Sequence, residues 1–149
     1  MNYLLKYYEE IENGHIIVGK ELKSVLDGLV NDLSNTRYFF DEEPGNVRIN
    51  FIETFCKHTK APFNGQPFKL ELWEKALLQV AYGYKMKSTG LRRFNEVVLL
   101  IARKNGKTTF LAGIDLAEFF LSKGGVDIIC ASNTNDQASI LFEEINNMR

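Results

Sequence analysis

The sequence predicts an α/β fold, in which an incomplete core of parallel strands is preceded by an N-terminal helical region. Apolar runs at residues 97–102 and 126–131 each lead into a polar turn and then a helical pattern. This strand–helix–strand–helix order with short connections favours parallel strands joined by a right-handed crossover. Before residue 60, apolar residues recur at helical spacing instead. We therefore expect a helical region over residues 1–59 and the α/β part over residues 60–149.

Composition places the chain among ordinary globular proteins. It has 149 residues, of which 45% are hydrophobic and 25% charged, enough for a domain with a sizeable core. The net charge of −1 argues against a general polyanion binder. Cys56 and Cys130 match neither a zinc spacing nor a disulfide framework, so we expect reduced thiols. The N-terminus is unlike a signal peptide, and no apolar run reaches the ~18 residues that span a bilayer, so we expect a cytoplasmic protein.

Six segments have the periodicity of amphipathic helices. They are residues 2–12, 20–33, 46–58, 70–82, 109–121 and 136–148. Three aromatic residues at 38–40 precede an acidic turn, and we interpret them as a packing anchor. The basic Ser/Thr/Gly segment from Gly83 to Arg93 is expected to be a connector.

The most informative stretch joins the first apolar run to the helix that follows it. Val97–Ala102 stops at a short polar turn, and Gly106-Lys107-Thr108 comes directly after that turn. A strand, a tight turn with Gly-Lys-Thr and a helix form the layout of a phosphate-binding loop. Main-chain N–H groups of the turn and of the helix N-terminus bind phosphate oxygens, and Gly106 lets the backbone approach them.

The side chains of this loop suit a nucleoside triphosphate with Mg²⁺. Lys107 can reach the β- and γ-phosphates, and Thr108 offers a hydroxyl to a magnesium ion that bridges them. Seven bases and one acid lie between residues 85 and 107, a basic field that suits nucleotide phosphates and also nucleic acid. For residues 85–93 a solvated linker is the alternative. We therefore predict ATP and Mg²⁺ as cofactors.

The loop departs from the full pattern G-x-x-x-x-G-K-[ST] at its first position, where Ile101 replaces glycine. A bare Gly-Lys-Thr is common by chance, and the flanking strand and helix are what give it weight. The alternative is a surface turn with an incidental lysine, in an α/β domain of another purpose.

With these residues in view, the chain resembles the large terminase subunit of tailed bacteriophages, the ATP-driven motor that packages DNA. Residues 102–109, Ala-Arg-Lys-Asn-Gly-Lys-Thr-Thr, look like that family's variant of the Walker A loop, which often lacks the first glycine and carries basic residues. Residues 65–74 are similar to its G-x-P-F-x-L-x-x-W-Q segment, which contributes to the adenine pocket, but Glu74 stands where Gln is usual. Ala131-Ser132-Asn133 and Gln137-Ala138 look like the motif after the family's second strand.

The resemblance implies a P-loop NTPase core and assigns roles to single residues. Lys107 and Arg103 are the catalytic candidates. Lys107 binds β/γ-phosphate, and either Arg103 or Lys104 faces the γ-phosphate as a sensor or an arginine-finger-like group, with the planar, always charged guanidinium of Arg103 as the better candidate. Thr108 is the metal ligand. The nucleotide-binding set is Phe68, Trp73, Arg103, Lys104, Asn105, Gly106, Lys107, Thr108 and Thr109. For Phe68 and Trp73 core packing is an equal alternative to stacking on the base, and for Arg103 and Lys104 the alternative is solvent exposure.

The resemblance also implies partners and a larger protein. The expected partners are double-stranded DNA, the small terminase subunit, the portal or prohead, and further copies in a homo-oligomeric motor ring in the host bacterial cytoplasm. A Walker B segment and the acidic cluster of the family's nuclease domain do not appear in the 149 residues, so we expect an N-terminal fragment of a longer ATPase and endonuclease. The alternatives are a helicase-like or other P-loop ATPase fragment, or a non-catalytic module for assembly or docking.

Overall fold

The computed structural model describes residues 1–148, which form two compact units. The first unit consists of residues 1–47 and 71–98, and the second consists of residues 48–70 and the chain from residue 99 onward. The predicted boundary near residue 60 concerns regions of sequence and stays a prediction. Each unit is described by itself below.

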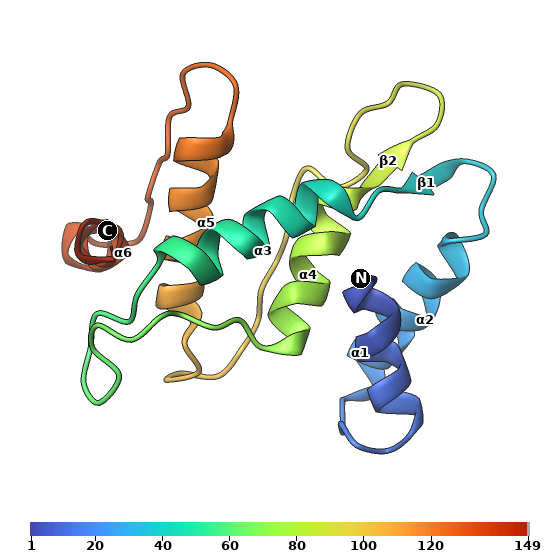
Figure 1. Cartoon of the computed structure of the whole chain (residues 1–149), viewed down its shortest axis with the longest axis horizontal. Coiled ribbons are helices and arrows are strands. Elements are labelled where there is room, and N and C mark those ends of the chain that lie inside the picture. Colours follow the sequence, from blue (N-terminus) through green and yellow to red (C-terminus); the bar gives the residue numbers. More distant parts are fainter. Residues whose placement is uncertain (149) are drawn as a thin grey trace. The chain divides into compact units, whose positions relative to one another are not determined.

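The first unit contains three helices and a small sheet (Figure 1). The elements are α1 (Tyr3–Glu12), α2 (Lys20–Asp32), α4 (Leu72–Gly83), β1 (Tyr38–Phe40) and β2 (Tyr84–Met86). Its core is built from Leu4, Tyr7, Leu26, Ala76 and Tyr84, which the apolar faces of the helices and the start of β2 bring together. The helical periodicity of the sequence therefore predicted three of these elements to within two residues.

A buried glutamine ties the start of the chain to α4. Gln79 is fully buried; its Nε2 donates to Met1 O and to Asn46 Oδ1, each at 2.7 Å, and its Oε1 accepts from Tyr3 N at 2.6 Å. A buried amide with all of these bonds made carries no desolvation penalty from unpaired groups. This explains why the polar Asn46 is held beside α4.

Helix α3 (Glu43–Phe55) begins three residues before the predicted start at Asn46. Asp41 Oδ1 accepts a hydrogen bond from Glu43 N at 3.1 Å, and Pro44 is tolerated because a first-turn N–H needs no partner within the helix. The acidic turn is thus partly the first turn of a helix, and α3 contributes residues to both units.

The aromatic residues at 38–40 form a strand, and Tyr38 and Phe40 pack against the core of the first unit, which confirms the predicted packing anchor. β1 pairs antiparallel with β2, with Tyr38 opposite Met86 and Phe40 opposite Tyr84. The rings of Phe40 and Tyr84 lie 4.7 Å apart, so the aromatic packing stabilises the pairing across the two strands. The connector over residues 83–93 therefore contains part of a sheet.

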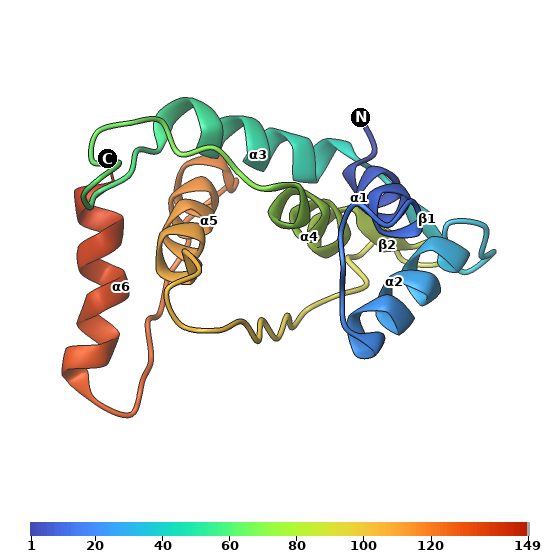
Figure 2. The ribbon, with the colours of Figure 1, turned by 90° about the horizontal axis from the view of Figure 1, so that it is seen from below.

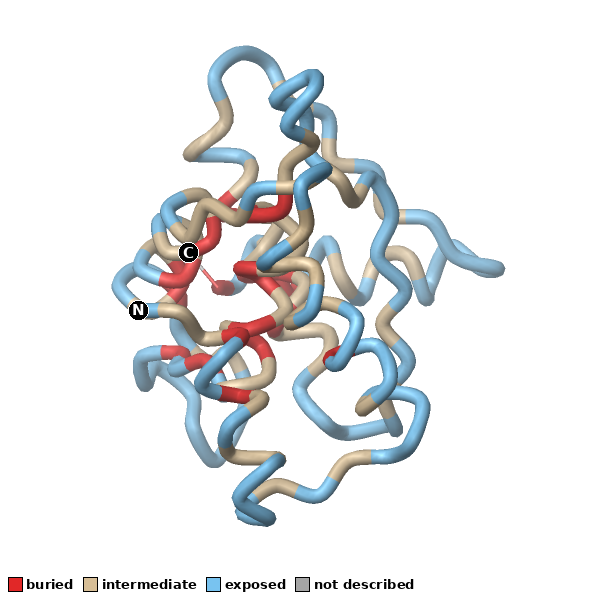
Figure 3. Tube along the Cα trace, turned by 90° about the vertical axis from the view of Figure 1, so that its right-hand side faces the viewer, coloured by how far each residue is buried: buried red, intermediate tan, exposed pale blue. Residues whose placement is uncertain are grey.

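The second unit packs most of α3 with α5 (Lys107–Leu121) and α6 (Asn135–Asn147) (Figure 2). Ile49, Ile52, Phe110 and Leu116 are buried, and a Cβ on Gly113 would meet Ile52 Cγ2 at 3.3 Å, which shows how closely α5 approaches α3. Buried positions in both units fall mainly on helices (Figure 3). Within residues 1–148 no helix is both long and apolar enough to cross a membrane.

The predicted parallel sheet is absent from the described residues, which are rich in helix and contain one two-stranded antiparallel sheet. Residues 97–102 and 126–131 are extended but make no ladder hydrogen bonds within residues 1–148. Their apolar side chains stay largely in solvent, with Val98 92%, Leu100 94% and Ile129 86% exposed. A strand needs a neighbouring strand to satisfy its backbone groups, and neither segment has one in this part of the chain.

Candidate functional site

The turn before α5 has an unusual backbone. Lys104 and Gly106 have positive φ angles of 67° and 72°, whereas Asn105 between them and Lys107 after them do not. Alternation of this kind points successive main-chain N–H groups toward one concave side, the arrangement called a nest, which binds anions. Asn105 Nδ2 donates to Ala102 O at 3.3 Å and closes the turn. A lysine held in the left-handed region costs about 1 kcal/mol or more, a strain typical of functional turns.

Helix α5 adds further donors to the same place. Its hydrogen bonding begins with Phe110 N, which donates to Gly106 O at 2.9 Å, so the N–H groups of Lys107, Thr108 and Thr109 have no acceptor within the helix. The helix is 15 residues long, and its dipole places partial positive charge at this end. The turn and the helix together therefore present the main-chain donors that an anion-binding site requires.

The cations of the turn have no acidic partner in the described part of the chain. Arg103, Lys104 and Lys107 make no ion pair among residues 1–148, although Lys23, Arg48, Lys85 and Arg93 each pair with a carboxylate. Arg103 and Lys104 are exposed, and Lys107 is half-buried beside the first turn of α5. Unpaired cations around a nest attract phosphate more strongly than neutralised ones.

Thr108 and Thr109 differ in what their hydroxyls contact. The Thr108 hydroxyl has no hydrogen-bond partner within residues 1–148, which fits a hydroxyl that serves as one ligand of a hydrated Mg²⁺ ion. Thr109 Oγ1 instead donates to Glu144 Oε1 at 3.0 Å. Glu144 belongs to α6 and was not among the predicted residues. Its only signal in the sequence was its place in the helix predicted over residues 136–148.

The basic segment over residues 85–93 belongs to the first unit, where two of its four bases pair with a carboxylate. Lys85 Nζ lies 2.7 Å from Asp41 Oδ2, and Arg93 Nη1 lies 2.6 Å from Asp32 Oδ2. The guanidinium of Arg93 also lies 4.0 Å from the centre of the Tyr38 ring. The Arg93 contact ties the segment to α2, and the Lys85 contact ties β2 to the residue after β1, so both bases have a structural role. The solvated-linker alternative fits the exposed Lys87.

The residues predicted to contribute to the adenine pocket make packing or capping contacts within their own units. Phe68 is 6% exposed, and the His58 ring stacks edge-on against it with the ring centres 5.1 Å apart. Trp73 is half-buried against the core of the first unit. Glu74 Oε2 accepts a hydrogen bond from Glu71 N at 2.8 Å and closes a capping box at the start of α4. Burial raises the pKa of Glu74 to about 7.

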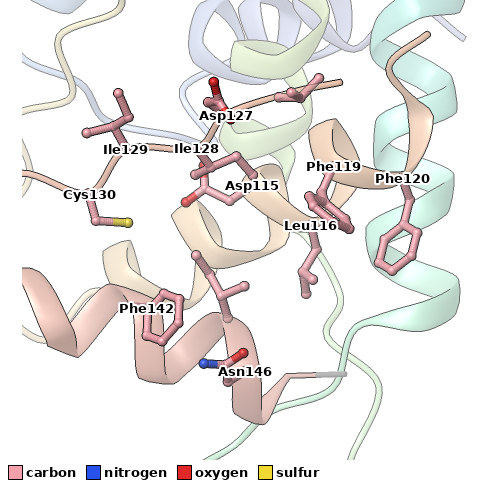
Figure 4. Close-up of a pocket in the computed structure, with 12 residues that line it drawn as sticks. Asp115, Leu116, Phe119, Phe120, Asp127, Ile128, Ile129, Cys130, Phe142 and Asn146 are labelled. Atoms are coloured by element: carbon pink, nitrogen blue, oxygen red, sulfur yellow. The ribbon is translucent and has the colours of Figure 1, made fainter. Parts of the chain in front are cut away.

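A pocket of about 600 Å³ lies in the second unit beside α5 and α6 (Figure 4). Apolar side chains such as Phe119, Phe142 and Ile128 line most of it. Its Asp115 has a pKa raised to about 6 by burial and then by the charge of Glu118. No group of three or more His, Cys, Asp or Glu side chains in the described residues is placed to hold a metal ion. The pocket has no residue in common with the turn at residues 102–109, so it lacks the main-chain N–H donors of that turn.

Comparison with known proteins shows the family to which this chain belongs. A family model described as "Terminase large subunit, ATPase domain" matches residues 72–149, just over half of the chain. The chain belongs to this family. The match begins at the first residue of α4 and includes the turn, α5 and α6, and the family implies a P-loop NTPase-like fold.

A curated relative supports the terminase assignment. The "Terminase, large subunit" of Enterobacteria phage HK97 is 32% identical over 100 residues, which are 66% of this chain and 19% of that protein. The matched part thus spans about a fifth of the length of this terminase relative. No solved structure matches the chain. The predicted resemblance to the terminase large subunit is confirmed.

Proposed function

We propose that this chain binds ATP as part of a terminase motor that packages viral DNA into a prohead. Membership of the terminase ATPase family supports the motor, and the geometry of one turn supports the nucleotide. The observation that carries the proposal is the nest at Lys104–Gly106, followed by unpaired Lys107 at the N-terminus of α5. A triphosphate offers the dense negative charge that such a set of donors binds.

Each residue of the turn has a role in this proposal. The N–H groups of residues 105–109 hold the phosphate chain, with Thr109 beside the α-phosphate, and Lys107 binds β- and γ-oxygens. Thr108 would hold Mg²⁺, which would offset the negative charge of the phosphate oxygens when bound. Arg103 is the candidate for the γ-phosphate because its guanidinium is planar and always charged, and Lys104 supplies a second exposed cation.

The fold that the family implies also assigns a role to the two apolar segments on either side of α5. We propose that residues 97–102 and 126–131 are strands of a parallel P-loop sheet. Their apolar composition and their position on either side of α5 support this. Phe68 and Trp73 were proposed to pack on the base; their burial supports core packing as the better interpretation.

Partners and further activities follow from the family alone. We propose double-stranded DNA, the small terminase subunit, the portal and a ring of identical motor subunits as partners, in the host bacterial cytoplasm, and an endonuclease in the full-length protein. The alternative of a docking module is compatible with nucleotide binding and needs its own test.

The test of the proposal is nucleotide binding at equilibrium, measured by calorimetry with Mg²⁺ and a non-hydrolysable ATP analogue. Lys107→Ala removes a charge-assisted bond of about 2 kcal/mol and should raise the Kd roughly 30-fold. Lys87→Ala is the matched control, because Lys87 is exposed and makes no ion pair within the described residues. The proposal fails if the wild-type chain does not bind the analogue, or if both variants weaken binding equally.

A further inference from the structure

The second unit contains a buried carboxylate that the proposed nucleotide site does not use directly. Glu144 of α6 is 2% exposed. Its Oε1 accepts hydrogen bonds from Thr109 Oγ1 at 3.0 Å and from Thr59 Oγ1 at 2.7 Å, and its Oε2 lies 3.2 Å from Lys60 Nζ. Three segments far apart in sequence, at residues 59–60, 109 and 144, therefore meet at one side chain.

The surroundings of Glu144 keep it charged. Burial alone would raise its pKa, but the bonds from Thr59, Lys60 and Thr109 outweigh that effect, so the pKa is lowered below its ordinary value. A buried carboxylate is costly unless such donors are in place, and Thr59, Lys60 and Thr109 supply them here. A fixed position for Thr109 is the consequence that bears on the phosphate site.

Thr109 stands two residues after Lys107, in the first turn of α5. With its hydroxyl donated to Glu144, its side chain points to α6, and only its main-chain N–H remains for a phosphate oxygen. The same hydrogen bond fixes the first turn of α5, which sets the direction of the N–H groups of residues 107–109.

We propose that Glu144 is a positioning residue of the nucleotide site, which acts through Thr109 to orient the first turn of α5. This inference rests on the proposed function, since it concerns the same phosphate site. Thr59 and Lys60 belong to it as the groups that keep the carboxylate of Glu144 charged and oriented.

The first experiment compares threonine variants in calorimetry with Mg²⁺ and the non-hydrolysable ATP analogue. Thr109→Val has nearly the same shape but cannot donate, and we expect its Kd to rise about 10-fold, which equals ~1.4 kcal/mol. Thr109→Ser keeps the hydroxyl and should restore binding to within about twofold of wild type. Thr59→Val removes a bond to the same oxygen from outside the turn, and it should lower thermal stability with a smaller change in Kd. Equal losses of affinity in Thr59→Val and Thr109→Val, or no rescue by Thr109→Ser, would overturn the proposal in favour of a merely structural contact.

The second experiment uses Glu144→Met, whose side chain has a similar length but no oxygen; glutamine would not serve, because its single oxygen could still accept from both Thr59 and Thr109. We expect Glu144→Met to raise the Kd about as much as Thr109→Val does. The double variant should show no further rise, because both changes break the same hydrogen bond between Thr109 and Glu144. Independent, additive losses would overturn the proposal. Circular dichroism identifies folded variants, and Thr109→Val keeps the test available if Glu144→Met does not fold.

The two proposals fail in different ways. Absence of binding by the wild-type chain overturns the proposed function and this inference with it. Binding that depends on Lys107 but not on Glu144 or on the Thr109 hydroxyl overturns only the inference.

Discussion

At the scale of a single residue, the carboxyl group of Glu74 caps the start of α4. It is 4% exposed, and its carboxyl group accepts from Glu71 N at the start of α4. Burial raises its pKa from 4.5 to about 7, while the bond from Glu71 N opposes that rise. Between pH 4.5 and about 7 the folded protein keeps the proton on Glu74, whereas the unfolded chain has already released it. The free energy of unfolding therefore falls as pH rises from 4.5 to about 7.

Glu74→Gln tests this linkage. Glutamine keeps an acceptor for Glu71 N and cannot ionise, so it should remove roughly 2–3 kcal/mol of the stability lost between pH 5 and pH 8. Urea denaturation of both proteins at the two pH values measures the difference. Asp115, whose pKa is raised to about 6, contributes loss of the same sign in both proteins and cancels from the comparison. An equal loss of stability with pH in the two proteins would contradict the prediction.

At the scale of elements, the approach of α3 to α4 in the first unit depends on a glycine. A Cβ on Gly45 would lie 2.7 Å from Gln79 Cα, a backbone contact that side-chain rotation cannot relieve. Gln79 is also the buried amide that holds Met1, Tyr3 and Asn46. A shift of α4 would therefore disturb several buried hydrogen bonds at once.

Gly45→Ala should destabilise the protein by about 3 kcal/mol, the upper range of overpacking in a closely packed site. Gly28→Ala is the matched control: Gly28 lies inside α2 with no atom within 4 Å of the added Cβ, so alanine should stabilise by roughly 0.5–1 kcal/mol. Thermal unfolding followed by circular dichroism measures both. A Gly45→Ala protein as stable as wild type would show that α3 and α4 are free to separate.

The helices were the elements that sequence could predict. Periodicity placed all six, and α5 runs from Lys107 to Leu121 against a prediction of 109–121. The predicted pairing of parallel strands is not met in the described residues, because an apolar run indicates that a segment is buried but does not identify the strand that would pair with it. Residues 97–102 and 126–131 are extended without such a neighbour in the described chain, while the strand pairing at Tyr38–Phe40 depends on a partner more than forty residues away.

At the scale of the whole molecule, the proposed site divides into a local part and a distant part. Gly106, Lys107 and Thr108 were predicted because a phosphate loop is a contiguous motif whose chemistry can be read from adjacent residues. Glu144 could not be predicted, because its contact with Thr109 spans 35 residues and its contact with Thr59 spans 85. Such contacts depend on how α3, α5 and α6 pack, which no local pattern records.

The chain as a whole is expected to bind nucleotide but to hydrolyse it slowly. Hydrolysis needs a group that orients or deprotonates water, and within residues 1–148 no carboxylate pairs with Lys107 or accepts from Thr108. The nearby acid, Glu144, is engaged by Thr59, Lys60 and Thr109. Loss of a general base lowers rates by about 10²–10⁴, so a typical turnover of roughly 10 s⁻¹ becomes about 10⁻¹–10⁻³ s⁻¹. Release of inorganic phosphate from Mg²⁺ and ATP measures the rate, with Lys107→Ala as the control for contaminating ATPases. Fast turnover by the wild-type chain that Lys107→Ala abolishes would show that a residue described here already activates the water.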